Sequence, residues 1–379
     1  MTTVPLPMPS LKRDGYGHAR MPRNAAVPEP ERIDRVAYGR FRNVYLYITE
    51  ACQLRCEHCY MGERLDRALK MPIGQIADTL TTWRRLGGSK LTILGGEPTL
   101  HPFYCDVIRL SRQLGYEHVI TTTNAQKPAL RRFRQLGPDD FAYVQVSLDG
   151  GSRSTHDAVR GAGTFDEAME TTRELAERGF DVRIICTVNK ANERDVLQLL
   201  DIADVLGVSL VKFHVFSTIG TGHGNPEMAM TPPEWVNFCD TLNDVAPEYK
   251  TRVWYQPTYA RRDQMERYAA EGYQGCIGRT LDRISIFPDG RCYVCSYLFD
   301  TDLYFAQMVD GQVQLNHGAN EFELFTSVLA ESSCGGCKAG GCMGGCPAEE
   351  VVMGESSCSA YEDIVPVCRL WKSSAKPED

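Results

Sequence analysis

The stretch VYLYITEACQLRCEHCY (residues 44–60) joins an apolar, β-rich run to three cysteines within eight residues. The run predicts a strand, and Cys52, Cys56 and Cys59 follow where it ends. Three thiolates on such a loop can be directed at one metal centre. A zinc site wants four protein ligands and finds only His58 nearby, whereas three thiolates on a four-iron cluster leave one iron open to a small molecule. A structural zinc ion with a distant fourth ligand stays open as the alternative.

Beyond this stretch, short β-rich runs alternate with amphipathic helical patterns up to about residue 247. The predicted strands are 44–49, 90–94, 118–123, 143–148, 182–188 and 210–216. Capping boxes are predicted at Thr164–Glu167 and Thr231–Glu234. Strands that are each followed by a helix imply parallel pairing with right-handed crossovers. Six units rather than eight indicate an α/β fold, an open partial (β/α)6 barrel, with its functional groups at the strand C-termini.

The remaining chain divides by composition. Residues 1–40 are rich in Pro, Gly and Arg and are expected to form an irregular arm. The partial barrel is expected over 41–247, a small cysteine-rich domain over 248–370, and a frayed tail over 371–379. Because the cysteine-rich part has few periodic apolar segments, we expect it to depend on bound metal for folding.

Overall composition excludes several classes of protein. The 379 residues carry a net charge of −8, which argues against a nucleic-acid partner or an anionic membrane surface. No apolar run is long enough to span a bilayer, and residues 1–15 lack the apolar core of a signal peptide, so a cytoplasmic location is predicted. Fifteen cysteines are more than a reducing cytosol leaves without a use. Cys105, Cys186 and Cys239 are scattered and are predicted to be small buried hydrophobes.

The first cysteine group resembles the radical S-adenosylmethionine (SAM) superfamily. The hallmark of that family is this three-then-two spacing with an aromatic residue, here His58, before the last cysteine. The resemblance covers roughly residues 42–217 and implies that Cys52, Cys56 and Cys59 hold a [4Fe–4S] cluster that binds SAM. His58 and Tyr60 would then pack by the adenine, although an aromatic core is an equal alternative for Tyr60.

A second motif, Gly95-Gly96-Glu97-Pro98, ends the second predicted strand and resembles the GGE motif of the same family. Two glycines let the backbone approach a cofactor. The carboxylate of Glu97 offers an acceptor for the methionine ammonium of SAM. A plain turn is the alternative for these residues, but their arrival on the second strand after the cysteine loop favours the family.

Further matches follow in the order that the family implies. Asn124 ends the third strand in a TTTNA segment, where the family usually has glycine in place of Ala125. By resemblance, Ser147 and Asp149 lie near the ribose and carboxylate of SAM, and Arg160 pairs with the carboxylate. A simple turn at Asp149 and a surface ion pair at Arg160 stay open.

The late cysteines resemble the SPASM domain, an auxiliary iron–sulfur extension of many radical SAM enzymes. The family usually has five residues between Cys337 and Cys342, and this chain has four. The resemblance implies two auxiliary [4Fe–4S] clusters, the nearer on Cys276, Cys292, Cys295 and Cys346, and the farther on Cys334, Cys337, Cys342 and either Cys368 or Cys358, with Cys368 preferred. Cys358 is then a spare thiol and a candidate hydrogen-atom donor. Zinc ribbons are the alternative.

The resemblance implies an oxidoreductase-type enzyme that makes a 5′-deoxyadenosyl radical to take a hydrogen atom from its substrate. We expect oxidative modification, as a crosslink or dehydrogenation, of a ribosomally made peptide in natural-product maturation. The alternative is a dehydrogenase or epimerase acting on a sugar or aminocyclitol; a non-catalytic iron–sulfur or zinc protein is a third reading. The acidic balance weakly favours a cationic substrate.

Several partners are expected. A reductant such as flavodoxin or ferredoxin must supply electrons. Only about 40 residues precede the first strand, which is too few for a winged-helix leader-binding domain. A peptide substrate would therefore need a separate leader-binding protein, or recognition by the C-terminal domain. Apart from the spare-thiol candidate Cys358, the sequence identifies no catalytic acid, base or hydrogen donor. His214, near the end of the last predicted strand, is a candidate only, and a satisfied core histidine is the more common fate.

Overall fold

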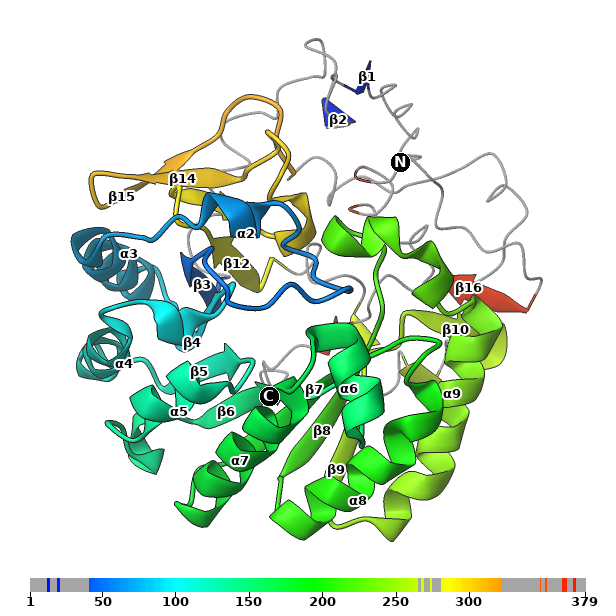
Figure 1. Ribbon diagram of the computed structural model, residues 1–379. Helices are drawn as coiled ribbons and strands as arrows, with labels where there is room; N and C mark the ends of the chain where they lie inside the picture. The colour runs from blue at the N-terminus through cyan, green and yellow to red at the C-terminus, as the bar shows by residue number, and fades with distance from the viewer. Residues whose placement is uncertain are drawn as a thin grey trace.

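The computed structural model describes residues 41–264 and 281–321, with the short stretches 12–13, 19–20, 267–268, 273–274, 348, 352, 363–366 and 371–372. Figure 1 shows an arc of strands with a layer of helices along its outer side. The predicted α/β fold with a large, mostly parallel sheet is therefore confirmed. Within the described residues no helix is long and apolar enough to cross a membrane.

One sheet runs through the molecule in the order β15-β14-β13-β12-β3-β4-β5-β6-β7-β8-β9. Its strands are β3 (Asn43–Thr49), β4 (Lys90–Gly95), β5 (His118–Thr123), β6 (Tyr143–Ser147), β7 (Val182–Val188), β8 (Leu210–Val215), β9 (Arg252–Tyr255), β12 (Arg283–Ile286), β13 (Arg291–Tyr293), β14 (Ala306–Val309) and β15 (Gln312–Leu315). Neighbouring strands are parallel from β12 through β3 to β9 and antiparallel from β12 to β15. The six predicted strands are thus confirmed as β3 to β8.

The helices follow the strands as the alternation predicts. They are α2 (Arg64–Arg67), α3 (Ile73–Arg85), α4 (Tyr104–Gln113), α5 (Lys127–Phe133), α6 (Arg153–Arg160), α7 (Thr164–Glu177), α8 (Val196–Leu206) and α9 (Pro232–Val245). The capping box at Thr231 is confirmed, because Thr231 N–H donates to Glu234 Oε2 at 2.6 Å and Glu234 N–H donates to Thr231 Oγ1 at 3.4 Å. The box predicted at Thr164 is wrong: Gly163 is the N-cap, and Asp157 accepts from the Gly163 and Phe165 N–H groups.

The sheet is wider than six strands because residues beyond 247 extend both of its edges. β9 pairs in parallel with β8, and β12 pairs in parallel with β3 over Arg283–Ile286. Side chains from the 281–308 segment belong to the same continuous hydrophobic core as the barrel strands, among them Ile284, Phe287, Leu298 and Phe305. Burial against the barrel therefore stabilises this part of the extension, whereas the sequence suggested that metal would have to do so.

Seven of the predicted auxiliary-cluster or spare thiols lie outside the described residues: Cys276, Cys334, Cys337, Cys342, Cys346, Cys358 and Cys368. Most of the predicted arm 1–40 and of the tail 371–379 also lies outside them. Cys105, Cys186 and Cys239 are buried and free. Their prediction as small buried hydrophobes is confirmed.

A buried ion pair joins the two ends of the cysteine loop. Glu50 directly follows β3, Arg64 begins α2, and Arg64 Nη1 donates to Glu50 Oε1 at 2.9 Å. Both side chains are almost fully buried, at 3% and 0% exposure. Arg67 adds a second contact to Glu50, at 2.6 Å. The segment between residues 50 and 64, which carries all three cysteines, is therefore closed by paired charges.

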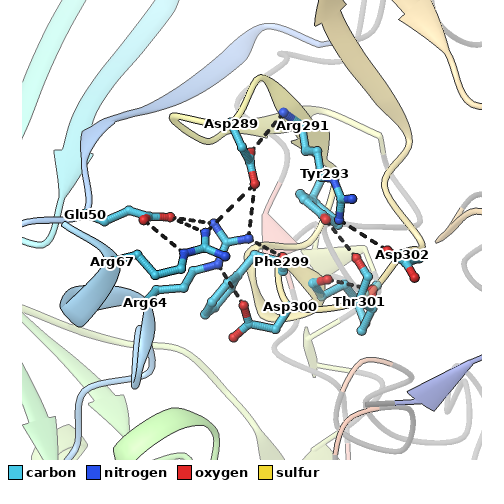
Figure 2. A network of polar contacts seen from close by, with 11 residues as sticks. Glu50, Arg64, Arg67, Asp289, Arg291, Tyr293, Phe299, Asp300, Thr301 and Asp302 are labelled. Atoms are coloured by element: carbon cyan, nitrogen blue, oxygen red, sulfur yellow. Dashed lines mark hydrogen bonds and ion pairs between the residues drawn. The ribbon is translucent and has the colours of Figure 1, made fainter. Parts of the chain in front are cut away.

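The same arginine binds the C-terminal extension (Figure 2). Arg64 Nε donates to Asp300 Oδ1 at 2.8 Å and Nη2 donates to the Phe299 carbonyl at 2.6 Å. The guanidinium lies over the rings of Phe287 and Phe299, 4.9 and 4.7 Å from their centroids. Because these contacts use every guanidinium nitrogen, Arg64 ties three segments of the chain together.

Arg64→Ala should lower the free energy of unfolding by about 3 kcal/mol, because it leaves a buried carboxylate with one of its two arginine partners missing. Arg55→Ala is the matched control, since Arg55 pairs with Asp66 at an exposed site, with 57% and 71% of the side chains accessible, and should cost less than about 1 kcal/mol. Urea denaturation of both variants measures the difference. Equal losses would show that the Arg64 network does not stabilise the fold.

Candidate functional site

The cysteine loop lies at the C-terminal edge of the parallel sheet, and segments that follow other strands hold it there. Glu57 N–H donates to the Val159 carbonyl of α6 at 3.0 Å, and Thr221 N–H, beyond β8, donates to the Cys59 carbonyl at 2.9 Å. Gly220 has a positive φ of 67°, and a Cβ there would clash with the carbonyls of Cys59 and Tyr60. The loop thus depends on close backbone contact with the segment after β8.

The three predicted cluster ligands lie in partly or fully buried positions. Cys56 is buried, and Cys52 and Cys59 are half-buried. Burial raises the pKa of Cys52 to about 12 and that of Cys56 to about 11, and it also raises the pKa of Cys59. These groups are therefore thiols in the metal-free protein, and a metal that binds them must displace their protons.

Nitrogen donors from two other segments, the residue after β5 and the end of α6, lie against two of these sulfurs. Asn124 Nδ2 donates to Cys52 Sγ at 3.7 Å, and Arg160 Nη1 donates to Cys56 Sγ at 3.9 Å. Hydrogen bonds and positive charge near the sulfurs stabilise thiolate-ligated iron, so the chemistry of these residues fits an iron–sulfur cluster. In the part of the chain that the structure describes, no group of three His, Cys, Asp or Glu side chains is gathered for metal binding, and the ligand assignment stays a prediction.

The two motif glycines are needed for packing against the cysteine loop. A Cβ on Gly96 would lie 2.5 Å from the Glu50 carbonyl oxygen and 2.6 Å from that of Ala51, and a Cβ on Gly95 would clash with the Thr49 carbonyl. Gly96 N–H donates to the Thr49 carbonyl at 2.9 Å. From the sequence we expected these glycines to let the backbone approach a cofactor. In the structure they allow close contact with the backbone of residues 49–51.

Glu97 is fully buried and its carboxylate is held by internal donors. Oε1 accepts from Thr99 N, Thr99 Oγ1 and Thr123 Oγ1 at 3.2, 2.6 and 2.9 Å. Oε2 accepts from Asn124 N at 2.7 Å. Burial raises its pKa against the lowering effect of these bonds. Oε2 has one protein donor and can therefore accept a further hydrogen bond, as the predicted contact with the methionine ammonium requires. The carboxylate also fixes the backbone at Asn124.

Asn124 joins the end of β5 to the cysteine loop. Its Oδ1 accepts from Gln53 Nε2 at 3.1 Å, while its Nδ2 donates to Cys52. Ala125 follows with a positive φ of 59°, which is the conformation that the usual glycine adopts without strain. The TTTNA segment therefore keeps the turn geometry despite the alanine. Gln53 was missed at the sequence level because nothing in its local pattern distinguishes it from any exposed polar residue.

Asp149 is a fully buried hub that contacts three segments. Oδ2 accepts from Arg160 Nε at 2.6 Å and from His58 Nε2 at 2.7 Å, and Oδ1 accepts from Thr187 N at 2.7 Å. Burial opposes its ionisation, but Arg160 and then His58 outweigh burial and lower its pKa. Asp149 is therefore an anion that orients Arg160 and His58. The turn and surface-pair alternatives for Asp149 and Arg160 are wrong.

Two ring nitrogens beside this hub lack partners. His58 Nε2 must donate to Asp149 because a carboxylate only accepts, and this leaves His58 Nδ1 buried without a hydrogen bond. His156 Nδ1 accepts from Asp149 N at 3.1 Å, and its Nε2 is likewise buried and unpaired. Burial, and then Arg160, lower the pKa of His156 to about 4, so this ring is neutral. Unpaired buried polar atoms are uncommon in proteins and fit a site that awaits a bound molecule.

Three further residues considered from the sequence, Ser147, Tyr60 and His214, differ in their surroundings. Ser147 ends β6 and is half-buried. Tyr60 belongs to the aromatic core, because its hydroxyl lies 2.7 Å from that of Tyr47 and its ring packs against Phe299. His214 on β8 lies 6.1 Å from the Trp254 ring. The core alternative for Tyr60 thus describes the structure.

Cys292 and Cys295 are the two predicted auxiliary ligands that the structure describes. Both are buried, on and just after β13. Burial raises the pKa of Cys292. Glu321, itself fully buried, accepts from the N–H groups of Val294 and Cys295. This carboxylate orders the segment that carries the second thiol.

Comparison with known proteins finds a family match and several similar protein sequences. The radical SAM superfamily matches residues 46–203. The chain is 25% identical over 343 residues to the mycofactocin maturase MftC of Mycobacterium tuberculosis, covering 86% of this chain and 84% of the relative. It is 26% identical to the AdoMet-dependent heme synthase of Methanosarcina barkeri, covering 66% and 75%.

Solved structures share the fold. SuiB of Streptococcus suis bound to precursor peptide SuiA is similar with a TM-score of 0.65 at 17% identity, covering 85% of this chain and 75% of that one. The structure of anSMEcpe with bound AdoMet and the Kp18Cys peptide has a TM-score of 0.64 at 19% identity, covering 85% and 92%. The matched segment 46–203 runs from β3 into α8 and contains the cysteine loop, Glu97, Asp149 and Arg160. This chain therefore contains a radical SAM superfamily domain.

Proposed function

We propose that this protein is a radical SAM enzyme that oxidatively modifies a residue of a ribosomally made precursor peptide. One observation carries the proposal: the loops after β3, β4, β5 and β6 meet at one edge of the sheet, around three cysteines and the Asp149 hub. Radical SAM enzymes bind SAM and a [4Fe–4S] cluster, and this edge supplies thiols, a buried carboxylate and a buried guanidinium within one set of contacts.

In this proposal Cys52, Cys56 and Cys59 hold the cluster. The chemistry that the cluster supplies with SAM bound is one-electron cleavage of the sulfonium to methionine and a 5′-deoxyadenosyl radical, which takes a hydrogen atom from the substrate. The protein orients the bound molecules and excludes water. Glu97 Oε2 would accept from the methionine ammonium, and the buried, unpaired Nδ1 of His58, within the cysteine loop, would offer a contact to the nucleoside.

The auxiliary clusters and partners complete the proposal. In this proposal Cys292 and Cys295 would hold a nearer cluster with Cys276 and Cys346. A farther cluster would be held by Cys334, Cys337, Cys342 and Cys368. These auxiliary clusters would supply an acceptor for an electron removed from the substrate, and a flavodoxin- or ferredoxin-type protein would supply the electron that the SAM-binding cluster needs. A separate leader-binding protein presents the peptide. We propose a cytoplasmic location for this assembly.

Two findings support a peptide over a small molecule. The relative that matches 86% of this chain is named a maturase, whereas the heme synthase matches 66%. Two similar folds hold a peptide in their solved structures. The heme synthase similarity keeps small-molecule chemistry as the second candidate.

Substituting Cys52, Cys56 and Cys59 together by Ala should abolish reductive formation of 5′-deoxyadenosine and remove about four of about twelve irons from anaerobically reconstituted protein. Cys105→Ala is the control, because Cys105 is a buried thiol on α4, away from the loop. It should keep both iron and SAM cleavage. Iron analysis and chromatography of the products provide the measurement. SAM cleavage that persists in the triple variant would disprove the cluster assignment.

Glu97→Gln should weaken SAM binding about ten-fold, because a neutral amide accepts more weakly and turns one acceptor into a donor that faces N–H and O–H groups. Glu117→Gln, which changes an exposed carboxylate, should leave affinity unchanged. Calorimetric titration of SAM into each reconstituted variant measures the effect. Equal affinities would remove Glu97 from the SAM site.

The substrate class is tested with purified, reconstituted enzyme. Short peptides encoded beside the gene are incubated with enzyme, SAM and reductant, and a mass change is sought by mass spectrometry. A loss of two hydrogens, or a crosslink, on an encoded peptide is the expected result. Turnover of a free aminoglycoside-type compound, with every neighbouring peptide unchanged, would replace the peptide proposal by the small-molecule candidate.

A further inference from the structure

The inner face of the strand arc carries basic side chains. Figure 1 shows that the parallel strands form an arc with the helices along its outer side. In these strands one alternating set of side chains belongs to the hydrophobic core, and the other set faces the inside of the arc. The register places Lys90, Arg183, Lys212 and Arg283 in this inner set, together with Tyr45, Tyr143 and Trp254. All seven keep part of their surface accessible. We call these residues the inner basic cluster.

Aromatic rings stack against three of the four cations. The Arg183 guanidinium lies 3.6 Å from the Tyr143 ring centroid, and the Lys212 ammonium lies 5.0 Å from that of Trp254. Arg283 lies 5.0 Å from the Tyr45 ring. Such contacts hold the cations in place, and an aromatic ring carries no formal negative charge that would neutralise them.

Few carboxylates balance this charge. Arg183 pairs with Asp181 at 2.7 Å, and Asp282, next to Arg283, accepts from Asn43 at 2.5 Å. Lys90 and Lys212 have no ion pair with any residue that the structure describes. An unpaired ammonium inside a protein is costly. Two partly buried ammonium groups on one inner face give it an excess of positive charge, which an anion would balance.

The electrostatic effect on Tyr45 agrees with this geometry. Burial by itself raises the pKa of a tyrosine. At Tyr45 the charges of Arg283, Lys212 and Lys90 outweigh burial, and its pKa is lowered. The potential inside the arc is therefore positive, although the whole chain carries a net charge of −8.

The inner basic cluster leads toward the cysteine loop. Tyr47 is the next inner residue of β3 after Tyr45, which places it roughly 7 Å closer to the C-terminal edge of the sheet. Its hydroxyl contacts that of Tyr60, the residue directly after Cys59. On β8, His214 is likewise the inner residue after Lys212. A molecule held by the cluster thus extends from the interior of the arc toward the site of hydrogen abstraction.

We propose that Lys90, Lys212 and Arg283 bind a carboxylate of the substrate below the cysteine loop. This inference rests on the proposed function, in which the substrate is a peptide, and it specifies that the peptide carries an acidic group that reaches the interior of the arc. Two sources share this chemistry: the side chain of Asp or Glu, and a carboxylate at the end of the peptide. The net charge of the chain favoured a cationic substrate, whereas the positive charge inside the arc favours an anionic group on the substrate.

Trp254 provides a direct test, because it stacks on Lys212. Trp83 and Trp235 are buried, and a Trp371→Phe background removes the remaining tryptophan, so that quenching by solutes reports on Trp254. In this background Lys212→Gln and Lys90→Gln should each lower the iodide quenching constant about two-fold, since a positive site concentrates anions. Quenching by neutral acrylamide should stay unchanged, which controls for altered exposure. Lys127→Gln, at a lysine with 67% of its side chain exposed on α5, is the matched control.

Three probe peptides then identify the carboxylate, with neither SAM nor reductant present. Acetyl-Gly-Glu-Gly-amide carries a side-chain carboxylate, acetyl-Gly-Ala-Gly carries a terminal one, and acetyl-Gly-Gln-Gly-amide carries none. Protection of Trp254 from iodide by either acidic peptide, lost in Lys212→Gln, supports the proposal and names the source. Equal protection by the neutral peptide, protection by inorganic phosphate alone, or equal iodide quenching in all variants overturns it. Because no turnover is involved, a failure of the proposed function leaves this result unaffected.

Discussion

The buried pair of Glu50 and Arg64 is the contact on which the rest of the site depends. These residues stand at the two ends of the cysteine loop, one directly after β3 and the other at the start of α2. Their ion pair closes the loop, and the remaining donors of Arg64 bind Asp300 and the Phe299 carbonyl in the extension. A loop of three cysteines has little apolar surface of its own. Paired buried charges give it a defined shape because either partner alone would be strongly unfavourable in the interior.

A second buried anion orders the opposite side of the loop. Asp149 accepts from Arg160, His58 and the Thr187 backbone, and Arg160 in turn reaches Cys56. Glu97 acts similarly at the end of β4 by fixing the Asn124 backbone. Each carboxylate lies at a strand end, so the sheet positions them and they position the loop. The site is therefore a layer of charges held between the strand ends and the cysteine loop.

The distribution of charge differs between the surface and the interior. The chain is acidic as a whole, yet the inner face of the arc gathers Lys90, Lys212 and Arg283 around Tyr45. Net charge governs long-range attraction and solubility, while a partly enclosed cluster decides what binds. The segment LVKFHVF (210–216) already indicated a polar inner face, because a lysine and a histidine interrupt an otherwise apolar strand. Only the register of the sheet showed that the lysine faces other cations from distant strands.

The sequence by itself determined the features that reside within short segments. The alternation of strand and helix patterns predicted β3 to β8, and the cysteine spacing with the GGEP motif predicted the radical SAM domain, because such signals need only neighbouring residues. Contacts between residues far apart in the chain were decided by the tertiary structure. The pairing of β12 with β3, the reach of Arg64 to Asp300, and the assignment of Asp149 to Arg160 and His58 could not be predicted. Asp149 and Arg160 are 11 residues apart, and the other partners are separated by 91 to 240 residues. No local pattern specifies which buried charge meets which.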